Sequence, residues 1–237
     1  MGILDSVNIR IAGNVVLLLA AGLVTGARGQ VPPTPAEARA YQGLLAAAHR
    51  GDTATIARLV REHPADLALR DAHGRTALHV ATFARRHDAL RALMAAGASS
   101  AALDNDRYDA VTIAAVADDE ATLRVLLAEG ASAKLVTSRY DGTALIAAAH
   151  LGHDGVVRQL IAAGAPLDHV NNLHWTAVIE AIVLGDGGAR HQRSLQALLD
   201  AGADTRLADR EGRTPLALAR GRGFSEMVAL LERAGAR

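Results

Sequence analysis

The chain has 237 residues and is half hydrophobic, but only six residues are aromatic, so alanine and leucine must supply most of the packing. Its 25 basic and 25 acidic residues balance, which excludes binding to nucleic acid or anionic lipid through bulk charge. The absence of cysteine excludes disulfides, thiolate metal sites, a cysteine nucleophile and a lipoprotein anchor.

Residues 1–29 have the pattern of a secretory signal peptide. Arg10 precedes an apolar run from Ile11 to Val24, and the small residues Ala27 and Gly29 suit cleavage before Gln30. A membrane-spanning helix needs about 20 apolar residues, so this run is too short for a permanent anchor. The alternative is a helix buried in the folded domain. We expect a cleaved signal and a bacterial protein that is periplasmic or secreted, with no permanent membrane anchor after cleavage.

Residues 30–37 are expected to form an extended linker. Three prolines fall within five residues between Val31 and Pro35, and proline is not tolerated in the interior of a helix.

An internal repeat covers the rest of the chain, residues 38–237. The pair Gly-Ala recurs with spacings of 33, 34, 38 and 33 residues, beginning at Gly97, Gly130, Gly164, Gly202 and Gly235. Each inner pair follows two apolar residues, and a residue able to cap a helix comes about twelve positions later, as at Thr143. This pattern predicts two short helices in each repeat. Because one repeat cannot bury its apolar faces alone, the stacking of neighbouring repeats must form the hydrophobic core.

Two segments of the chain resemble the Gly-x-Thr-Pro-Leu-His signature of the ankyrin repeat family. They are Gly74-Arg-Thr-Ala-Leu-His79 and Gly212-Arg-Thr-Pro-Leu216, and Gly152-His153 is similar to the Gly-His that joins the family's two helices. The resemblance implies an all-α ankyrin-repeat solenoid of paired short helices with projecting turn hairpins. It implies about six repeats including caps, and structural roles for His79 and His153.

The ends and two irregularities depart from the inner repeats. Glu232 stands where inner repeats carry an apolar residue, as expected for a terminal repeat with no neighbour to cover. The turn between Gly130 and Thr143 is one residue longer than the others. Five extra residues near Gly185–His191 predict an enlarged inter-helix loop, either a tolerated surface insertion or a contact loop.

No catalytic or cofactor motif is present. The sequence lacks a Gly-x-Ser-x-Gly elbow, a phosphate loop and a His-Glu-x-x-His pair. His150 and His153 lie three residues apart, but tetrahedral zinc requires four ligands and none follows nearby in sequence. We therefore expect no enzyme, no cofactor and no metal, although a small metal-binding protein that uses surface histidines stays as an alternative.

In the resembling family, partners meet the projecting turns and the first-helix face of each repeat, where we expect an additional apolar strip of Phe83, Val116 and Leu151. Register places three aromatic residues on three successive turns, and aromatic residues flanked by arginine are typical of binding hot spots. The alternative is that these rings pack sideways and stiffen the stack. The predicted partner-binding residues are Arg75, Phe83, Arg107, Tyr108, Arg139, Tyr140, His174, Trp175 and Arg213.

The function favoured by these observations is a protein-binding scaffold in the periplasm or outside the cell. It would shield, chaperone or inhibit a partner protein, an immunity-type inhibitor being one such role. A host-directed ankyrin effector is the runner-up. We expect a monomer that binds another protein and no nucleic acid.

Overall fold

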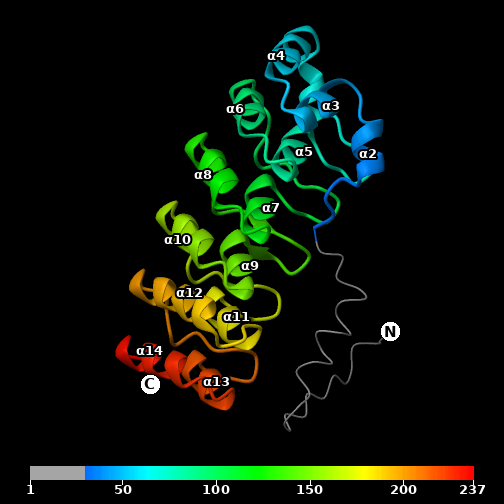
Figure 1. The fold of residues 1–237 in the computed structure, drawn as a ribbon. Helices are drawn as coiled ribbons and strands as arrows, with labels where there is room; N and C mark the ends of the chain where they lie inside the picture. The colour runs from blue at the N-terminus through cyan, green and yellow to red at the C-terminus, as the bar shows by residue number, and fades with distance from the viewer. Residues whose placement is uncertain (1–29) are drawn as a thin grey trace, which may run out of the picture. The chain divides into compact units, whose positions relative to one another are not determined.

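Helices arranged in two parallel columns build the chain (Figure 1). The computed structural model describes residues 30–237, so the predicted signal segment lies outside the described residues. The first helices of the repeats are α3 (Gly43–Arg50), α5 (Ala77–Phe83), α7 (Ala110–Val116), α9 (Ala144–Leu151), α11 (Ala177–Val183) and α13 (Pro215–Gly221). The second helices are α4 (Thr53–Glu62), α6 (His87–Ala95), α8 (Glu120–Ala128), α10 (Asp154–Ala162), α12 (Ala189–Asp200) and α14 (Ser225–Arg233). These six pairs confirm the predicted solenoid.

From α5 onward, the first helices begin at capping side chains. The hydroxyls of Thr143 and Thr176 each accept the backbone N–H three residues ahead, and Asp109 does the same with its carboxylate. Thr76 shares a capping box with His79, whose Nδ1 accepts the Thr76 N–H at 3.1 Å while Nε2 donates to the carbonyl of Tyr108 at 3.1 Å. Burial lowers the pKa of His79, which keeps the neutral form that both contacts require.

The hydrophobic core runs without interruption along the stack and consists mainly of leucine and alanine. On the second helices, a pair of fully buried apolar residues recurs in every inner repeat, such as Leu123 and Leu126 on α8. On the first helices, buried alanines such as Ala115 and Ala149 let adjacent backbones approach closely. The composition thus produces thin, similar layers, each of which is completed by its neighbours.

The two ends of the stack differ from its middle. Glu232 is exposed on α14 and pairs with Arg220 at 2.6 Å, which confirms the expected polar terminal face. At the other end, the extended linker predicted for residues 30–37 is wrong in its second half, because α2 (Pro35–Ala40) begins there. Proline is tolerated at a first helical position, and Thr34 and Glu37 complete a capping box.

Projecting hairpins lead into the first helices of the inner repeats. Only the longer turn is paired as strands within residues 30–237, with β1 (Val136–Thr137) antiparallel to β2 (Gly142–Thr143). A 3-10 turn, η1 (Pro64–Ala68), connects the first repeat to the second. In the described part of the chain, no helix is both long and apolar enough to cross a bilayer.

Candidate functional site

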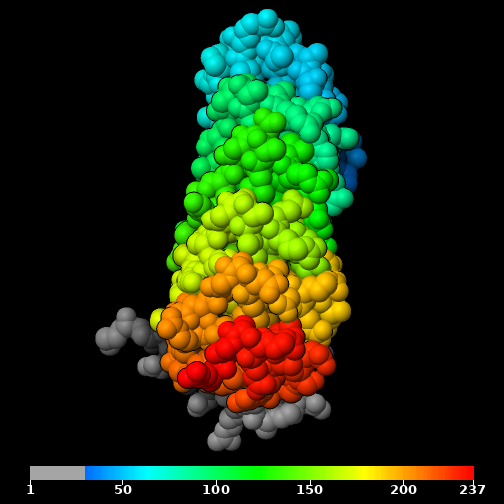
Figure 2. All heavy atoms as spheres, turned by 90° about the vertical axis from the view of Figure 1, so that its left-hand side faces the viewer, coloured from blue at the N-terminus to red at the C-terminus, as the bar shows by residue number. Residues whose placement is uncertain are grey.

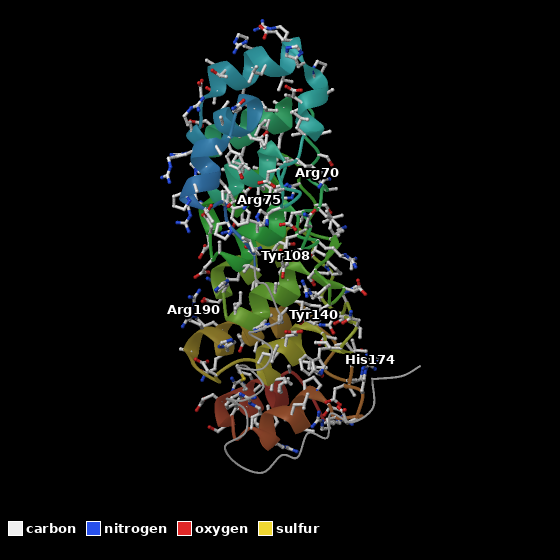
Figure 3. The ribbon with its side chains drawn as sticks, turned by 90° about the vertical axis from the view of Figure 1, so that its right-hand side faces the viewer. Arg70, Arg75, Tyr108, Tyr140, His174 and Arg190 are labelled. Atoms are coloured by element: carbon white, nitrogen blue, oxygen red, sulfur yellow. The ribbon has the colours of Figure 1, made fainter. Side chains whose placement is uncertain are left out.

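The hairpins are joined to one another along the stack. Backbone hydrogen bonds connect the first four hairpin tips: Asn105 N to His73 O at 2.9 Å, Ser138 N to Arg107 O at 2.8 Å, and Asn172 N to Tyr140 O at 2.9 Å. The Arg210 side chain of the fifth hairpin donates to Asn172 O. In Figure 3, Tyr108, Tyr140 and His174 follow one another down this edge. The hairpins therefore form one connected platform rather than independent loops.

Each of the three central hairpins contains a non-glycine residue in the left-handed backbone conformation that glycine normally adopts. Arg107, Asp141 and His174 have φ values of 65°, 52° and 65°. The flanking hairpins place Gly74 and Gly212 at the same position in the repeat. A left-handed residue with a Cβ costs roughly 1–2 kcal/mol, so these three side chains are kept at the expense of stability. Such strain concentrates at functional sites.

Two ion pairs cross between the central hairpins. Arg107 Nη2 lies 3.2 Å from Asp141 Oδ1, and Arg139 Nη2 lies 3.4 Å from Asp106 Oδ1. Both arginine side chains are half exposed. They are therefore accessible to a partner and at the same time hold the hairpin tips together.

The predicted aromatic residues are half-buried rather than fully exposed. Burial raises the pKa of Tyr108, and the ring of Tyr140 is likewise only partly accessible. Trp175 is half-buried and packs against the hydrophobic core, as the alternative of sideways packing requires. These rings take part in packing and also present an edge at the surface. Phe83 is half-buried at the end of α5.

The first and last predicted arginines have structural partners. Arg75 is 1% exposed, so the prediction that it is available to a partner is wrong. Its Nε lies 2.5 Å from Asp71 Oδ2 and its Nη2 lies 3.0 Å from Glu37 Oε1, which ties α2 to the first hairpin. Arg213 repeats the arrangement with Asp209, at 2.6 Å, and keeps a side chain that is 38% exposed.

Exposed aliphatic residues occur at two repeat positions that the sequence reasoning largely missed. Of the five exposed large hydrophobic residues in the described chain, four lie in the third and fourth full repeats. They precede the hairpin turn or end the first helix, and we call them the apolar set: Val136, Leu151, Val170 and Leu184. Only Leu151 was expected on the first-helix face. Register was the available signal, because Val136 and Val170 occupy one repeat position and Leu151 and Leu184 the other.

The insertion near Gly185–His191 is not a free loop. Helix α12 has 12 residues where α10 has nine, so part of the insertion extends the helix. Arg222 donates to the carbonyls of Val183 and Gly185 at 2.6 and 2.8 Å, and His191 Nε2 donates to the carbonyl of His150 at 2.9 Å. The loop between α11 and α12 spans residues 184–188, against 117–119 between α7 and α8, so the expected enlargement is present but modest, and the loop is fixed against two neighbouring repeats.

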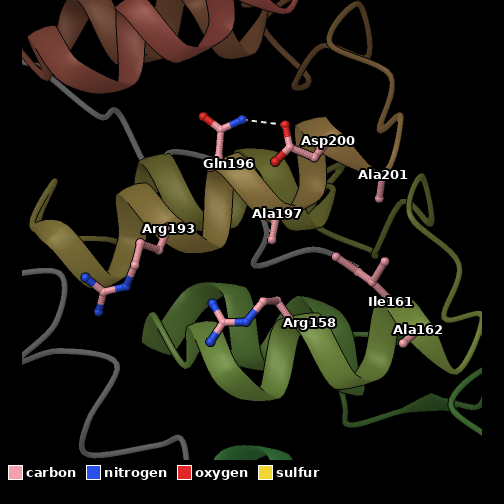
Figure 4. A pocket seen from close by; sticks show the side chains of 8 residues that line it. All are labelled: Arg158, Ile161, Ala162, Arg193, Gln196, Ala197, Asp200 and Ala201. Atoms are coloured by element: carbon pink, nitrogen blue, oxygen red, sulfur yellow. Dashed lines mark hydrogen bonds between the residues drawn. The ribbon is translucent and has the colours of Figure 1, made fainter.

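The second helices line a shallow groove of about 510 Å³ between α10 and α12 (Figure 4). Its two arginines, Arg158 and Arg193, lie 3.0 and 2.9 Å from Asp154 Oδ2. One carboxylate is thus shared by two arginines whose side chains are more than half exposed. The same column of second helices faces the viewer in Figure 2.

His150 and His153, the two histidines that lie three residues apart, contact different partners. His153 Nδ1 donates to the carbonyl of Ala115 at 2.9 Å, whereas His150 Nδ1 faces Glu180 Oε2 at 3.2 Å. Among residues 30–237, no three histidine or acidic side chains gather in a way that would hold a metal ion.

Comparisons with known proteins find ankyrin repeats over most of this stack. A family model described as ankyrin repeats (3 copies) matches residues 44–137 and 111–206. The ankyrin repeat protein YahD of Escherichia coli (strain K12) is 37% identical over 172 residues, which cover 72% of this chain and 85% of that protein.

Solved structures show the same similarity. An ankyrin repeat domain from Acinetobacter baumannii AYE has a TM-score of 0.72 and 44% identity, and covers 82% of this chain and 98% of that one. A predatory endopeptidase of Bdellovibrio bacteriovorus in complex with an immunity protein gives a TM-score of 0.61 at 22% identity, covering 81% of this chain and 98% of that one. At that identity the likeness concerns the fold alone.

Proposed function

The chain belongs to the ankyrin repeat family, and we propose that it is an exported scaffold that holds a partner protein on its hairpin and first-helix side. Ankyrin repeats bind other proteins and are generally non-catalytic. The observation that carries the proposal is the apolar set, because four of the five exposed large hydrophobic residues within residues 30–237 fall in two adjacent repeats. Clustered exposed apolar side chains favour burial against a partner.

The strained hairpins support the same side of the molecule. Arg107, Asp141 and His174 are confined to the central hairpins, and the apolar set lies in the repeats that two of these hairpins open. Half-buried aromatic rings beside accessible arginines supply the residue types that are enriched in hot spots. The second-helix side lacks this combination, since none of the exposed large hydrophobic residues of the described chain lies on a second helix.

The test of the binding side is a charge placed in the apolar set. Leu184→Asp should abolish capture of the partner from a periplasmic extract. The bound partner would bury an unpaired carboxylate, and the desolvation of that carboxylate is unfavourable. Ala121→Asp is the matched control, since Ala121 is exposed on α8, a second helix. Partner capture that survives Leu184→Asp, or that Ala121→Asp abolishes, would place the binding surface elsewhere.

A periplasmic extract is the appropriate source of the partner if the chain is exported. We propose cleavage near Gln30, since a basic residue, a short apolar run and two small residues precede that position. Mass spectrometry of the protein from a bacterial host should give a mature chain that starts at or near Gln30. An intact Met1 terminus in the cytoplasmic fraction would contradict the proposal.

The role of the complex depends on what the partner does. An inhibitor of the immunity type would lower the activity of its partner at a one-to-one ratio. A chaperone would raise the refolding yield of the partner, and a shield would slow its proteolysis. A host-directed effector would instead bind a host protein and would require a further export signal. The recovered partner, assayed with and without this chain, separates these roles.

A further inference from the structure

Glu180 is an acid at an apolar position of the repeat. It stands on α11 where other repeats carry Val80, Ile113 and Leu218, and its side chain is 5% exposed. Burying a carboxylate is costly unless charge or hydrogen bonds compensate. The residue therefore requires an explanation beyond packing.

The compensation of Glu180 differs from that of the other buried acids. Asp154 pairs with arginines, Asp209 pairs with Arg213, and Asp109 caps a helix. Glu180 instead accepts from Asn171 Nδ2 at 2.9 Å and faces His150 Nδ1 at 3.2 Å. In the described part of the chain, it forms no ion pair with an arginine or with the lysine.

A second substitution in the same repeat accommodates this acid. Asn171 occupies the hairpin position that Asp104 and Asp209 hold elsewhere. Its Oδ1 still accepts the backbone N–H groups of Leu173 and Trp175, both at 3.0 Å, as the aspartates do in their own turns. Its amide nitrogen Nδ2, a donor that an aspartate does not have, donates to Glu180. Two positions thus depart together from the aspartate and the large apolar residue that the first, second and fifth full repeats carry.

Glu180 is the acidic neighbour of His150. The ring nitrogen that faces its carboxylate is Nδ1, so a neutral ring with its hydrogen on Nδ1 would leave Nε2 as an acceptor. The His150 side chain is 45% exposed. Leu151 follows it directly, and Leu184, the C-cap residue of α11, lies four residues beyond Glu180. Glu180 therefore places a carboxylate that is not paired with any arginine of residues 30–237 beside two members of the apolar set.

We propose that Glu180 and His150 together recognise a cationic side chain of the partner protein. An arginine or lysine would lay its aliphatic stem on Leu151 and Leu184 and donate from its head group to His150 Nε2, close to the charge of Glu180. Arg222 does not occupy this role, because its guanidinium is held by the carbonyls of Val183 and Gly185 and lies over the Phe224 ring. The inference rests on the proposed function and specifies the chemistry of the partner.

A random twelve-residue peptide display library, panned on the full mature chain, tests this chemistry without the natural partner. Peptides selected on the wild type should be enriched several-fold in arginine or lysine next to apolar residues. Glu180→Gln should remove the basic enrichment and retain the apolar one. Glu226→Gln is the matched control, because Glu226 is exposed on α14 at the far end of the stack, and its pool should equal the wild-type pool.

Affinity measurements on one selected peptide then quantify the pairing. Glu180→Gln should weaken its binding about tenfold, and replacing the basic residue of the peptide by norleucine should cause no further loss in that variant. If Glu180→Gln does not fold, the double variant Asn171→Asp with Glu180→Leu replaces it, because this combination stands at Asp209 and Leu218.

The outcomes separate two failures. Basic enrichment that persists on Glu180→Gln, or acidic enrichment on the wild type, overturns the cationic assignment and leaves the binding surface in place. A wild-type pool with no enrichment, or one unchanged by Leu184→Asp, contradicts the proposed surface itself and this inference with it.

Discussion

Arg190 Nη2 lies 2.7 Å from Asp118 Oδ2, although the two residues are 72 positions apart in the chain. Arg190 Nε also lies 3.4 Å from Asp154 Oδ1, so one side chain of the inserted segment ties three repeats together. Asp118 has a left-handed φ of 54°, where Gly152 and Gly223 occupy the equivalent turns. The strain at Asp118 is thus offset by an ion pair that the insertion makes available.

This relationship predicts a coupled effect on stability. In an Arg190→Ala background, Asp118→Gly should stabilise the fold by up to about 1 kcal/mol, because the strain is relieved and no ion pair remains to be lost. In the wild type the same change should be nearly neutral, since the two effects offset each other. Urea unfolding of the four proteins measures the difference. Equal effects in both backgrounds would show that the residues act independently.

The register predicts opposite outcomes at two positions of the second helices. Leu126 is fully buried on α8, so Leu126→Ala should cost about 2–5 kcal/mol. Glu232→Leu should be far milder or even stabilising, because its side chain is 49% exposed on the last helix. Urea titration compares the two variants. Similar destabilisation by both would contradict the assignment of Glu232 to a terminal face.

Local signals in the sequence were sufficient to predict the fold. Each repeat carries a capping residue, an apolar pair and a glycine that takes a left-handed φ, as at Thr176, Leu160 and Gly164. These features act within one repeat and recur, so register alone located the helices. Helix α2 was missed because Pro35 was interpreted as a helix breaker, whereas Thr34 and Glu37 make it a first helical residue.

The candidate site depended on contacts between repeats, which register does not specify. Arg75 and Trp175 share one repeat position, yet Arg75 is buried by ion pairs with Asp71 and Glu37 and Trp175 packs on the core. Glu37 comes from a helix outside the repeat pattern. The partner of an arginine 38 positions away could not be read from periodicity, so exposure was predicted where burial occurs.

Asp154 gives the fold a pH-dependent contribution. Hydrogen bonds from Arg193, with further pairing to Arg158, lower the pKa of Asp154 from 3.8 to about 2. A carboxyl whose pKa is lower in the folded state stabilises the fold above its unfolded pKa and loses that contribution as the pH falls. Asp154→Asn should therefore be less stable than the wild type at pH 6, and the gap should narrow as the pH falls from about 4 towards 2. Urea midpoints at several pH values test this, and a gap independent of pH would contradict it.

His174 should show opposite effects on stability and on binding. His174→Gly removes a Cβ from a left-handed residue with a φ of 65°, and glycine stands at this position in the hairpins of Gly74 and Gly212. We expect the free energy of unfolding to rise by up to about 1 kcal/mol. If the side chain contacts the partner, affinity should fall in the same variant. Denaturation and calorimetry measure the two quantities, and a loss of stability would refute the strain at this hairpin.

Trp175 is the residue at which packing and binding must be separated. Its half-buried ring packs against the core, so Trp175→Ala should lower stability as well as weaken partner binding by at least about 2 kcal/mol, the usual hot-spot threshold. Trp175→Leu keeps an apolar side chain against the core while removing the ring, so it should remain folded and still lose affinity. Because Trp175 is the only tryptophan, its fluorescence also reports the contact directly, and its emission should shift to the blue when the partner covers it. A folded Trp175→Leu variant with unchanged affinity, or wild-type emission that does not respond to saturating partner, would assign the ring to packing alone.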